Sequence, residues 1–334
     1  MLIYGLMKDK KRKDPNKMKK ILALVLALCM IFALCACGQK AAETAETAAE
    51  AVENAAEEAV EEVSEAAEEV VEDFSQYTID ELKSLVKTVN DGKLTVATSP
   101  DFAPYEFYAL DESGNPTLAG FDIAIAGYIA DYLGLELEII PMDFDGVLLE
   151  IANGSVDLGL AGLSPDPARM DAMDFSDIYY MGGQSFVTVK GKEDNFPTLE
   201  ATNDVKFSIG AQTGSIQETL AATNSPDADI VSVTKVTDII AMLLNDKLDG
   251  AYIETAVAET YAKNYPDLVV LLDVPYDTEG SACGIAKGNP ALVAAVNLAI
   301  NAAIADGSMD SFVATANDMA SGNIYEGLLE NMEG

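Results

Sequence analysis

After residue 78, apolar runs of strand length alternate with stretches in which apolar residues recur at helical spacing. This pattern predicts strands that alternate with helices. Runs of strand length occur at 94–98, 136–140 and 156–163, and apolar residues at helical spacing fill much of the sequence between them. The run at 156–163 has almost no polar residue, which is typical of a strand buried on both faces of a parallel sheet. The pattern therefore predicts βαβ units and an α/β fold.

The second half of the chain repeats this order. A strand at 205–209 precedes the capping-box pattern that begins at Ser215, and a helix at 237–244 leads through a short polar turn to a strand at 248–253. The same order of helix, turn and strand occurs earlier in the chain and ends at residue 163. We expect two similar lobes with a cleft between them, lined by strand ends and helix N-termini.

A sharp turn follows the strand at 156–163. Ser164 is a good N-cap and Pro165 suits the first helical position, so we expect a helix to start here. Ligands of open α/β sheets bind where strands end and the next helices begin. Arg169 lies just inside this turn.

Arg169 and Arg12 are the only arginines in the chain. Its planar guanidinium can bind a carboxylate through two parallel hydrogen bonds, which lysine cannot do. The alternative is a surface ion pair with a nearby acid, for which Asp166, Asp171 and Asp174 are available. The position at a strand end favours a ligand-binding role.

The N-terminal segment is predicted to be a signal rather than part of the fold. A basic stretch at 8–20 precedes an apolar stretch at 21–34, which is shorter than a membrane-spanning helix. We expect residues 1–36 to be a lipoprotein signal peptide that makes Cys37 the lipidated first residue of the mature chain. An uncleaved membrane anchor is the alternative, and it too would place the body outside the cytoplasm.

Residues 37–73 are predicted to be an acidic Ala/Glu linker, because 41–73 contain no basic residue. Alanine favours helix, whereas glutamates one turn apart oppose it, so the linker is expected to be partly helical or disordered. A coiled-coil stalk would have only a thin apolar seam.

Composition excludes several functions. The net charge of −36 argues against nucleic-acid binding. The chain has no histidine, and only Cys283 would remain free in a lipidated mature protein. A Ser-His or Cys-His nucleophile and an intrachain disulfide are therefore excluded, and we expect no metal site and no cofactor.

Five segments in order, 94–107, 120–122, 141–144, 156–169 and 175–180, resemble the extracellular solute-binding proteins of polar amino-acid ABC importers, with the glutamine-binding branch most similar. The resemblance runs from about residue 94 to residue 311. It implies a two-lobe periplasmic-binding-protein fold of type II, with parallel-rich sheets flanked by helices and a hinge of two crossovers. The expected division is 74–186 for the first part of lobe 1, 187–275 for lobe 2 and 276–334 for the C-terminal return to lobe 1.

The resemblance also implies roles for individual residues. Arg169 matches the arginine that grips the α-carboxylate of the ligand, and Glu254 matches the acid that holds its α-ammonium. The positions that match other contacts are backbone and hydroxyl groups at Gly162, Ser164, Ser215 and Ile216, aromatic walls at Phe102 and Phe144, and side-chain-reading positions at Ser99 and Gln212. Each of these alone also has an ordinary structural explanation as a core residue or a helix cap.

Three departures from the family pattern affect these expectations. Ser99 stands where relatives commonly carry Asp, which argues against a strongly basic ligand. Glu254 replaces the usual Asp and keeps its charge on a longer arm. The C-terminal tryptophan signature is absent, because the chain has no tryptophan.

The function that follows is a lipid-anchored, extracytoplasmic receptor that binds an amino acid with a neutral polar or acidic side chain and presents it to an ABC permease. We expect a monomer without enzymatic activity. One alternative is a sensory module for a separate signalling partner. Another is a small dehydratase on the same fold, for which Asp143 and Asp145 would be the candidate acids.

Overall fold

The structure is a computed structural model that describes residues 74–111, 113–277, 280–322 and 324. The chain divides into two compact units, Met1–Asp73 and Phe74–Gly334, and the fold described below is that of the second unit. The predicted signal peptide, Cys37 and the acidic linker lie outside the described residues.

Lobe 1 is defined here as the elements around a five-stranded sheet with the order β5-β1-β6-β13-β7. β1 runs parallel to β5 and β6, whereas β13 runs antiparallel to β6 and β7. Its strands are β1 (Lys93–Thr98), β5 (Glu136–Pro141), β6 (Leu158–Gly159), β7 (Met173–Tyr180) and β13 (Ser281–Ala286). Its helical elements are η1 (Phe74–Gln76), α3 (Ile79–Lys83), α4 (Phe121–Leu133), α5 (Phe144–Ala152), α9 (Pro290–Ala305) and α10 (Ser308–Ala320).

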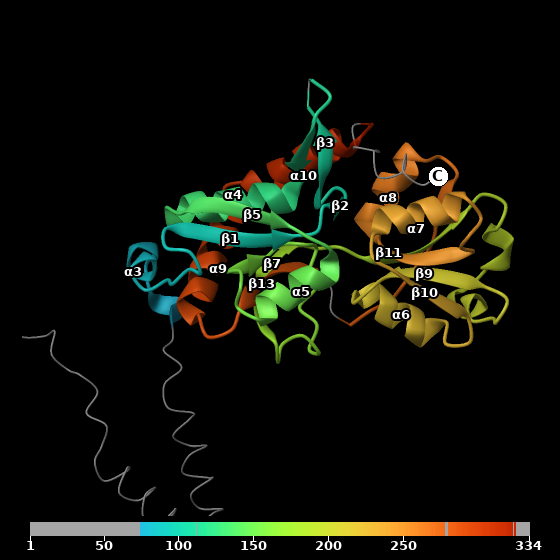
Figure 1. The fold of residues 1–334 in the computed structure, drawn as a ribbon, viewed down its shortest axis with the longest axis horizontal. Helices are drawn as coiled ribbons and strands as arrows, with labels where there is room; N and C mark the ends of the chain where they lie inside the picture. Colours follow the sequence, from blue (N-terminus) through green and yellow to red (C-terminus); the bar gives the residue numbers. More distant parts are fainter. Residues whose placement is uncertain (1–73, 112, 278–279, 323, 325–334) are drawn as a thin grey trace, which may run out of the picture. The chain divides into compact units, whose positions relative to one another are not determined.

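Lobe 2 is built around a second five-stranded sheet with the order β10-β9-β11-β8-β12. β9 runs parallel to β10 and β11, and Figure 1 shows α6 on one side of these strands and α7 and α8 on the other. Its strands are β8 (Gln184–Val189), β9 (Ser208–Gln212), β10 (Asp229–Val233), β11 (Gly250–Glu254) and β12 (Leu268–Asp273). Its helical elements are η2 (Glu193–Asn195), η3 (Leu199–Thr202), α6 (Ile216–Asn224), α7 (Val236–Leu244) and α8 (Thr255–Asn264).

A small antiparallel sheet formed by β2 (Asp101–Phe102), β3 (Glu106–Leu110) and β4 (Pro116–Ala119) follows β1 in the chain. The chain passes from the first large sheet to the second at residues 181–183 and returns at residues 274–280. β8 thus begins within the second sheet at Gln184, a few residues before the expected boundary between 186 and 187. After the return, α9 and α10 pack on α4.

The alternating pattern is confirmed as an α/β fold with mixed, parallel-rich sheets, but one local prediction is wrong. No helix starts at Ser164. Residues 167–172 form turns instead, and the strand predicted at 156–163 is reduced to β6. The reason is the pair Pro165 and Pro167, because each proline removes an N–H and disfavours helical backbone at the residue before it. Asp166 then stabilises the turn by accepting from the Ala168 N–H at 2.7 Å.

The buried core is continuous across the two lobes. The same hydrophobic cluster contains Phe121 and Ile129 of lobe 1 and Ile239 and Tyr261 of lobe 2. Among the described residues no single helix is long and apolar enough to cross a membrane. Only α9 and α10 taken together pass that test of length and composition, and they are bent by 77° at their junction.

Gly120, at the start of α4, shows how closely the loop after β1 packs against this helix. Its φ is +122°, and a Cβ added here would lie 2.0 Å from the Tyr105 carbonyl oxygen. Gly154 also has a positive φ, of +67°, but a Cβ there would meet nothing within 4 Å.

We predict that Gly120→Ala lowers the free energy of unfolding by at least about 3 kcal/mol, because the new methyl group overlaps backbone that cannot move alone. Gly154→Ala, the matched control, should cost only about 1 kcal/mol of left-handed strain. Urea denaturation of both variants measures the difference. Equal losses would show that the close approach to Tyr105 is not a constraint.

Candidate functional site

The candidate site lies at the lobe junction, by which we mean the surface where side chains of one lobe bond to the other. Several hydrogen bonds cross it, and three of them involve predicted site residues. Arg169 Nη2 donates to the Gly214 carbonyl at 3.2 Å, Tyr105 Oη donates to Glu254 Oε1 at 3.1 Å, and Gln212 Nε2 donates to Asp101 Oδ2 at 3.1 Å. The predicted residues in these bonds are Arg169, Glu254 and Gln212.

Arg169 projects from the turn after β6 towards the start of α6. Its guanidinium donates to two carbonyls, those of Ser164 at 3.3 Å and Gly214, and lies 5.7 Å from the Phe144 ring centroid. Among the described residues it has no carboxylate within ion-pair distance, so the surface ion pair considered from the sequence does not form. Desolvation lowers the pKa of Arg169, and the charge of Asp166 opposes this. The guanidinium stays ionised, with donors left for an anion.

The aromatic and glycine positions pack around this turn. A Cβ on Gly162 would lie 2.7 Å from a ring carbon of Phe102, so glycine is needed for the ring to approach. Phe102 is buried, and its ring centroid lies 5.4 Å from that of Tyr105. Phe144 is also buried, at the first position of α5. The two predicted aromatic walls thus both belong to lobe 1.

Glu254 is the last residue of β11 and the N-cap of α8. Oε2 accepts from the Val257 N–H at 2.9 Å, while Oε1 accepts from Tyr105 Oη and, at 3.4 Å, from the Gly183 N–H in the crossover. The side chain is buried and pairs with no cation in the described part of the chain. Desolvation raises its pKa to about 7, against the lowering effect of these hydrogen bonds. It therefore holds negative charge at a desolvation cost that a bound cation would offset.

Ser99 and Gln212 both donate hydrogen bonds to Asp101, a residue that the sequence analysis did not identify. Asp101 Oδ1 accepts from Ser99 Oγ at 2.7 Å, and Oδ2 accepts from Gln212 Nε2 and, at 2.6 Å, from the N–H of Val236 at the start of α7. Asp101 is 5% exposed, and desolvation raises its pKa to about 6. This carboxylate of lobe 1 therefore caps a helix of lobe 2.

Ser215 and Ile216 form the start of α6. The Ser215 hydroxyl accepts from the Glu218 N–H at 3.2 Å and donates to the Gln212 carbonyl at 2.6 Å, which confirms the predicted N-cap. Both residues are buried. The helix N-terminus next to Gly214 thus lies close to the Arg169 guanidinium.

Behind the predicted positions lies a second group of buried polar residues that sequence reasoning also missed. Asp122 Oδ2 accepts from the Gly162 N–H at 3.0 Å and Oδ1 accepts from Tyr179 Oη at 2.8 Å, so it fixes the backbone of a site residue. Glu106 is fully buried, and its two carboxylate oxygens have no hydrogen-bond partner. Desolvation and the neighbouring acids, Asp122 first, raise the pKa of Glu106 well above its ordinary value. The one sequence signal for Glu106 and Asp122 is that they lie in the segments 94–107 and 120–122, which carry the resemblance to the solute-binding proteins.

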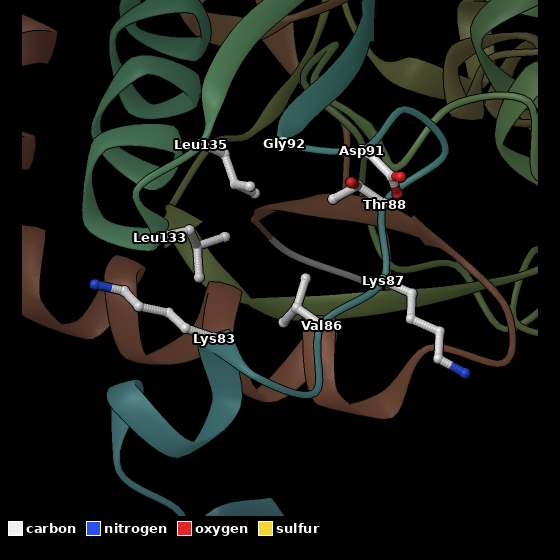
Figure 2. A pocket seen from close by; sticks show the side chains of 8 residues that line it. All are labelled: Lys83, Val86, Lys87, Thr88, Asp91, Gly92, Leu133 and Leu135. Carbon is white, nitrogen blue, oxygen red and sulfur yellow. The ribbon is translucent and has the colours of Figure 1, made fainter.

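Two cavities were located in the described part of the chain. One, of about 290 Å³, is lined by Ser99, Pro100, Asp101, Tyr108, Pro141, Met142, Asp143 and Lys235, and so includes residues of both lobes. The other, of about 470 Å³, lies in lobe 1 away from every predicted site residue. Figure 2 shows Leu133, Leu135 and Val86 around its centre and the ends of both lysines pointing away. We assign no ligand to this second cavity.

No group of three or more His, Cys, Asp or Glu within the described residues is arranged to hold a metal ion. What the junction offers instead is one guanidinium and two carboxylates, all desolvated and all without an oppositely charged partner at bonding distance. Such an arrangement suits a small molecule that carries both signs of charge.

Comparison with known proteins identifies the class. Residues 94–315 match the model of the bacterial extracellular solute-binding proteins, family 3, and the chain belongs to this family. It is 32% identical over 200 residues to the arginine-binding extracellular protein ArtP of Bacillus subtilis (strain 168), covering 58% of this chain and 74% of the relative. It is 26% identical over 184 residues to the cyclohexadienyl dehydratase of Pseudomonas aeruginosa, covering 55% of this chain and 67% of the relative.

The fold is shared with solved structures. An amino acid ABC transporter substrate-binding protein, AbpA, from Streptococcus pneumoniae Canada MDR_19A, bound to L-arginine, superposes with a TM-score of 0.67 at 31% identity, covering 73% of this chain and 100% of that one. The resemblance to the solute-binding family and the type II periplasmic-binding-protein fold are thus confirmed. These relatives do not confirm the glutamine-binding branch.

The buried carboxylate of Glu254 predicts a dependence of stability on pH in the absence of ligand. Its pKa is about 7 in the folded protein, against an ordinary value of 4.5, so the native state binds the extra proton between these values. The stabilising contribution is therefore present below pH 4.5 and is lost as the pH rises through 7.

Glu254→Gln should remove this contribution, and the loss of unfolding free energy between pH 5 and pH 8 should shrink by up to about 3 kcal/mol. Urea denaturation across this range measures it. Glu259→Gln, which neutralises an exposed acid of the same helix, is the control and should leave the profile unchanged. An unchanged profile in Glu254→Gln would refute the assignment.

Proposed function

We propose that this protein is a receptor that binds a free amino acid at the lobe junction, with Arg169 on the α-carboxylate and Glu254 on the α-ammonium. The observation that carries the proposal is that the buried carboxylate of Glu254 and the half-buried guanidinium of Arg169 have hydrogen bonds but no ion partner among the described residues. A zwitterion would pair with both. Each charge-assisted hydrogen bond would contribute roughly 1.5–3 kcal/mol.

The remaining predicted residues would complete the site. Phe102 and Phe144 would enclose the ligand side chain, Gly162, Ser164, Ser215 and Ile216 would add backbone or hydroxyl contacts, and Ser99 and Gln212 would face its distal end. The contacts described above support this assignment, because Phe144 stacks near Arg169 and Ser99 bonds to the same carboxylate as Gln212.

The receptor would pass its ligand to an ABC importer, as a monomer held outside the cytoplasm by lipid on Cys37. Membership of an extracellular solute-binding family supports the extracytoplasmic location and the transport role. For the ligand side chain, Ser99 favours a neutral polar or acidic group, whereas ArtP and the L-arginine-bound AbpA are relatives whose names point to a basic one.

A dehydratase is the second candidate, and the relative from Pseudomonas aeruginosa is the observation that favours it. Against it, Asp143 and Asp145 are both exposed and lie at the first turn of α5. An exposed carboxylate is solvated by water and lacks the buried setting that is typical of a catalytic acid. We therefore propose a binding protein without catalysis. A sensory role would need a separate signalling partner.

We predict that one or a few of the twenty amino acids raise the thermal stability of the protein, and that Arg169→Lys weakens their binding at least about tenfold, because lysine keeps the charge but loses the planar fork. A ligand at about 100 times its dissociation constant adds roughly 2.7 kcal/mol of stability, which a thermal-shift screen detects. Calorimetry then gives the affinities.

The control for this experiment is Lys287→Ala, which breaks a surface ion pair with Asp174 at 3.4 Å and should not change binding. Recovery of the ligand unchanged after incubation separates binding from dehydration. Affinity that is equal in Arg169→Lys and the wild type would exclude Arg169 as the carboxylate holder.

The lipid anchor makes a separate prediction. In a bacterial host fed with labelled fatty acid, the wild-type chain should carry label and sediment with membranes. Cys37→Ser should lose the label and leave the membrane fraction, while Cys35→Ser should keep both, because Leu34 is too large for cleavage before residue 35. Label that persists in Cys37→Ser would refute the predicted lipidation site.

A further inference from the structure

We propose that Asp101 is the specificity-determining residue of this receptor and that it selects an amino acid whose side chain ends in a cation, such as a guanidinium or an ammonium group. The inference rests on the proposed function, because it concerns the distal end of the same ligand. It also changes the significance of Ser99, whose lack of charge was the reason to expect a neutral polar or acidic side chain.

The first step is that a carboxylate, that of Asp101, follows Ser99 by two residues and bonds to its side chain. Ser99 Oγ donates to Asp101 Oδ1 at 2.7 Å, so the serine hydroxyl positions a carboxylate and its hydrogen atom is not free to contact the ligand. Gln212, the predicted reading position of lobe 2, donates to the other oxygen of the same carboxylate at 3.1 Å. Both residues that were predicted to contact the ligand side chain therefore donate hydrogen bonds to Asp101.

The second step is that this carboxylate lacks a cation. Asp101 is 5% exposed and receives its hydrogen bonds from a hydroxyl, an amide and a backbone N–H. Lys235 acts on it only through its charge, since the Lys235 ammonium lies 3.9 Å from Asp143 and is partly exposed. Three of about four lone-pair positions are used, which leaves one for a ligand donor. A buried carboxylate in this state gains most from a cation.

The third step is that a cavity of suitable shape adjoins Asp101. The cavity of about 290 Å³ has two carboxylates in its wall, Asp101 and Asp143, with Ser99 and Lys235. Its apolar surface comes from Pro100, Pro141, Met142 and the ring of Tyr108. Apolar walls suit the aliphatic stem of a long side chain, and the carboxylate suits a charged end. An acidic side chain would instead bring a second negative charge to Asp101.

The test uses L-arginine and L-citrulline, which have nearly the same shape but differ in the charge of the distal group. We expect calorimetry at pH 7.5 to give the wild type an affinity for arginine at least about tenfold higher than for citrulline. Asp101→Asn should weaken arginine binding about 10- to 100-fold and citrulline binding less than about threefold, which removes the preference.

Asp101→Asn isolates the charge, because the asparagine carbonyl can still accept from Val236 and Gln212 while its amide donates to a rotated Ser99 hydroxyl. Asp101→Glu is the second variant. It keeps the charge and should retain part of the preference. Asp267→Asn is the control, since it removes an exposed acid that pairs with Lys190 at 3.7 Å and does not line this cavity, and it should change the arginine-to-citrulline ratio less than about twofold.

The outcomes separate the proposals. Equal weakening of both ligands in Asp101→Asn would overturn the inference, because it would make Asp101 a contact between the lobes and not a reader of charge. Wild-type binding of citrulline or another neutral amino acid as tightly as arginine would overturn it as well, without any variant, while leaving the receptor function intact. Binding of no amino acid by the folded wild type would refute the receptor function itself.

Discussion

The burial of unpaired charge is the constraint on which the junction between the lobes depends. Glu254 and Asp101 are buried and Arg169 is half-buried, and none has an oppositely charged partner at bonding distance among the described residues. An ion removed from water loses several kcal/mol, and neutral donors and carbonyls return only part of it. A core of apolar residues would not carry this cost, and a ligand with the opposite charges would relieve it.

Helix N-termini reduce the cost for the acids. Ser215 caps α6, Asp101 accepts from the first N–H of α7, and Glu254 caps α8. Three successive helices of lobe 2 thus begin at the junction, and the partial positive charge at each N-terminus favours negative groups close to it. The carboxylate of Asp101 reaches its helix from the other lobe.

A second layer of polar residues keeps the first in position. Asp122 holds the N–H of Gly162 and the hydroxyl of Tyr179, while Tyr105 contacts Phe102 on one side and Glu254 on the other. The scaffold is that of the solute-binding family. Within it, Ser99 donates to Asp101 and Glu254 accepts from Tyr105.

The sequence by itself determined the α/β class, most of the helices and strands and the family, because these depend on local periodicity, capping residues and the order of short motifs. It did not determine that Pro165 and Pro167 prevent a helix, where two local preferences conflict. Nor could it reveal Asp101, since the partners of this carboxylate, Gln212 and Val236, lie 111 and 135 residues away in the chain. Only the tertiary structure decides which distant groups meet, because desolvation and charge act through space and leave no pattern in the order of residues.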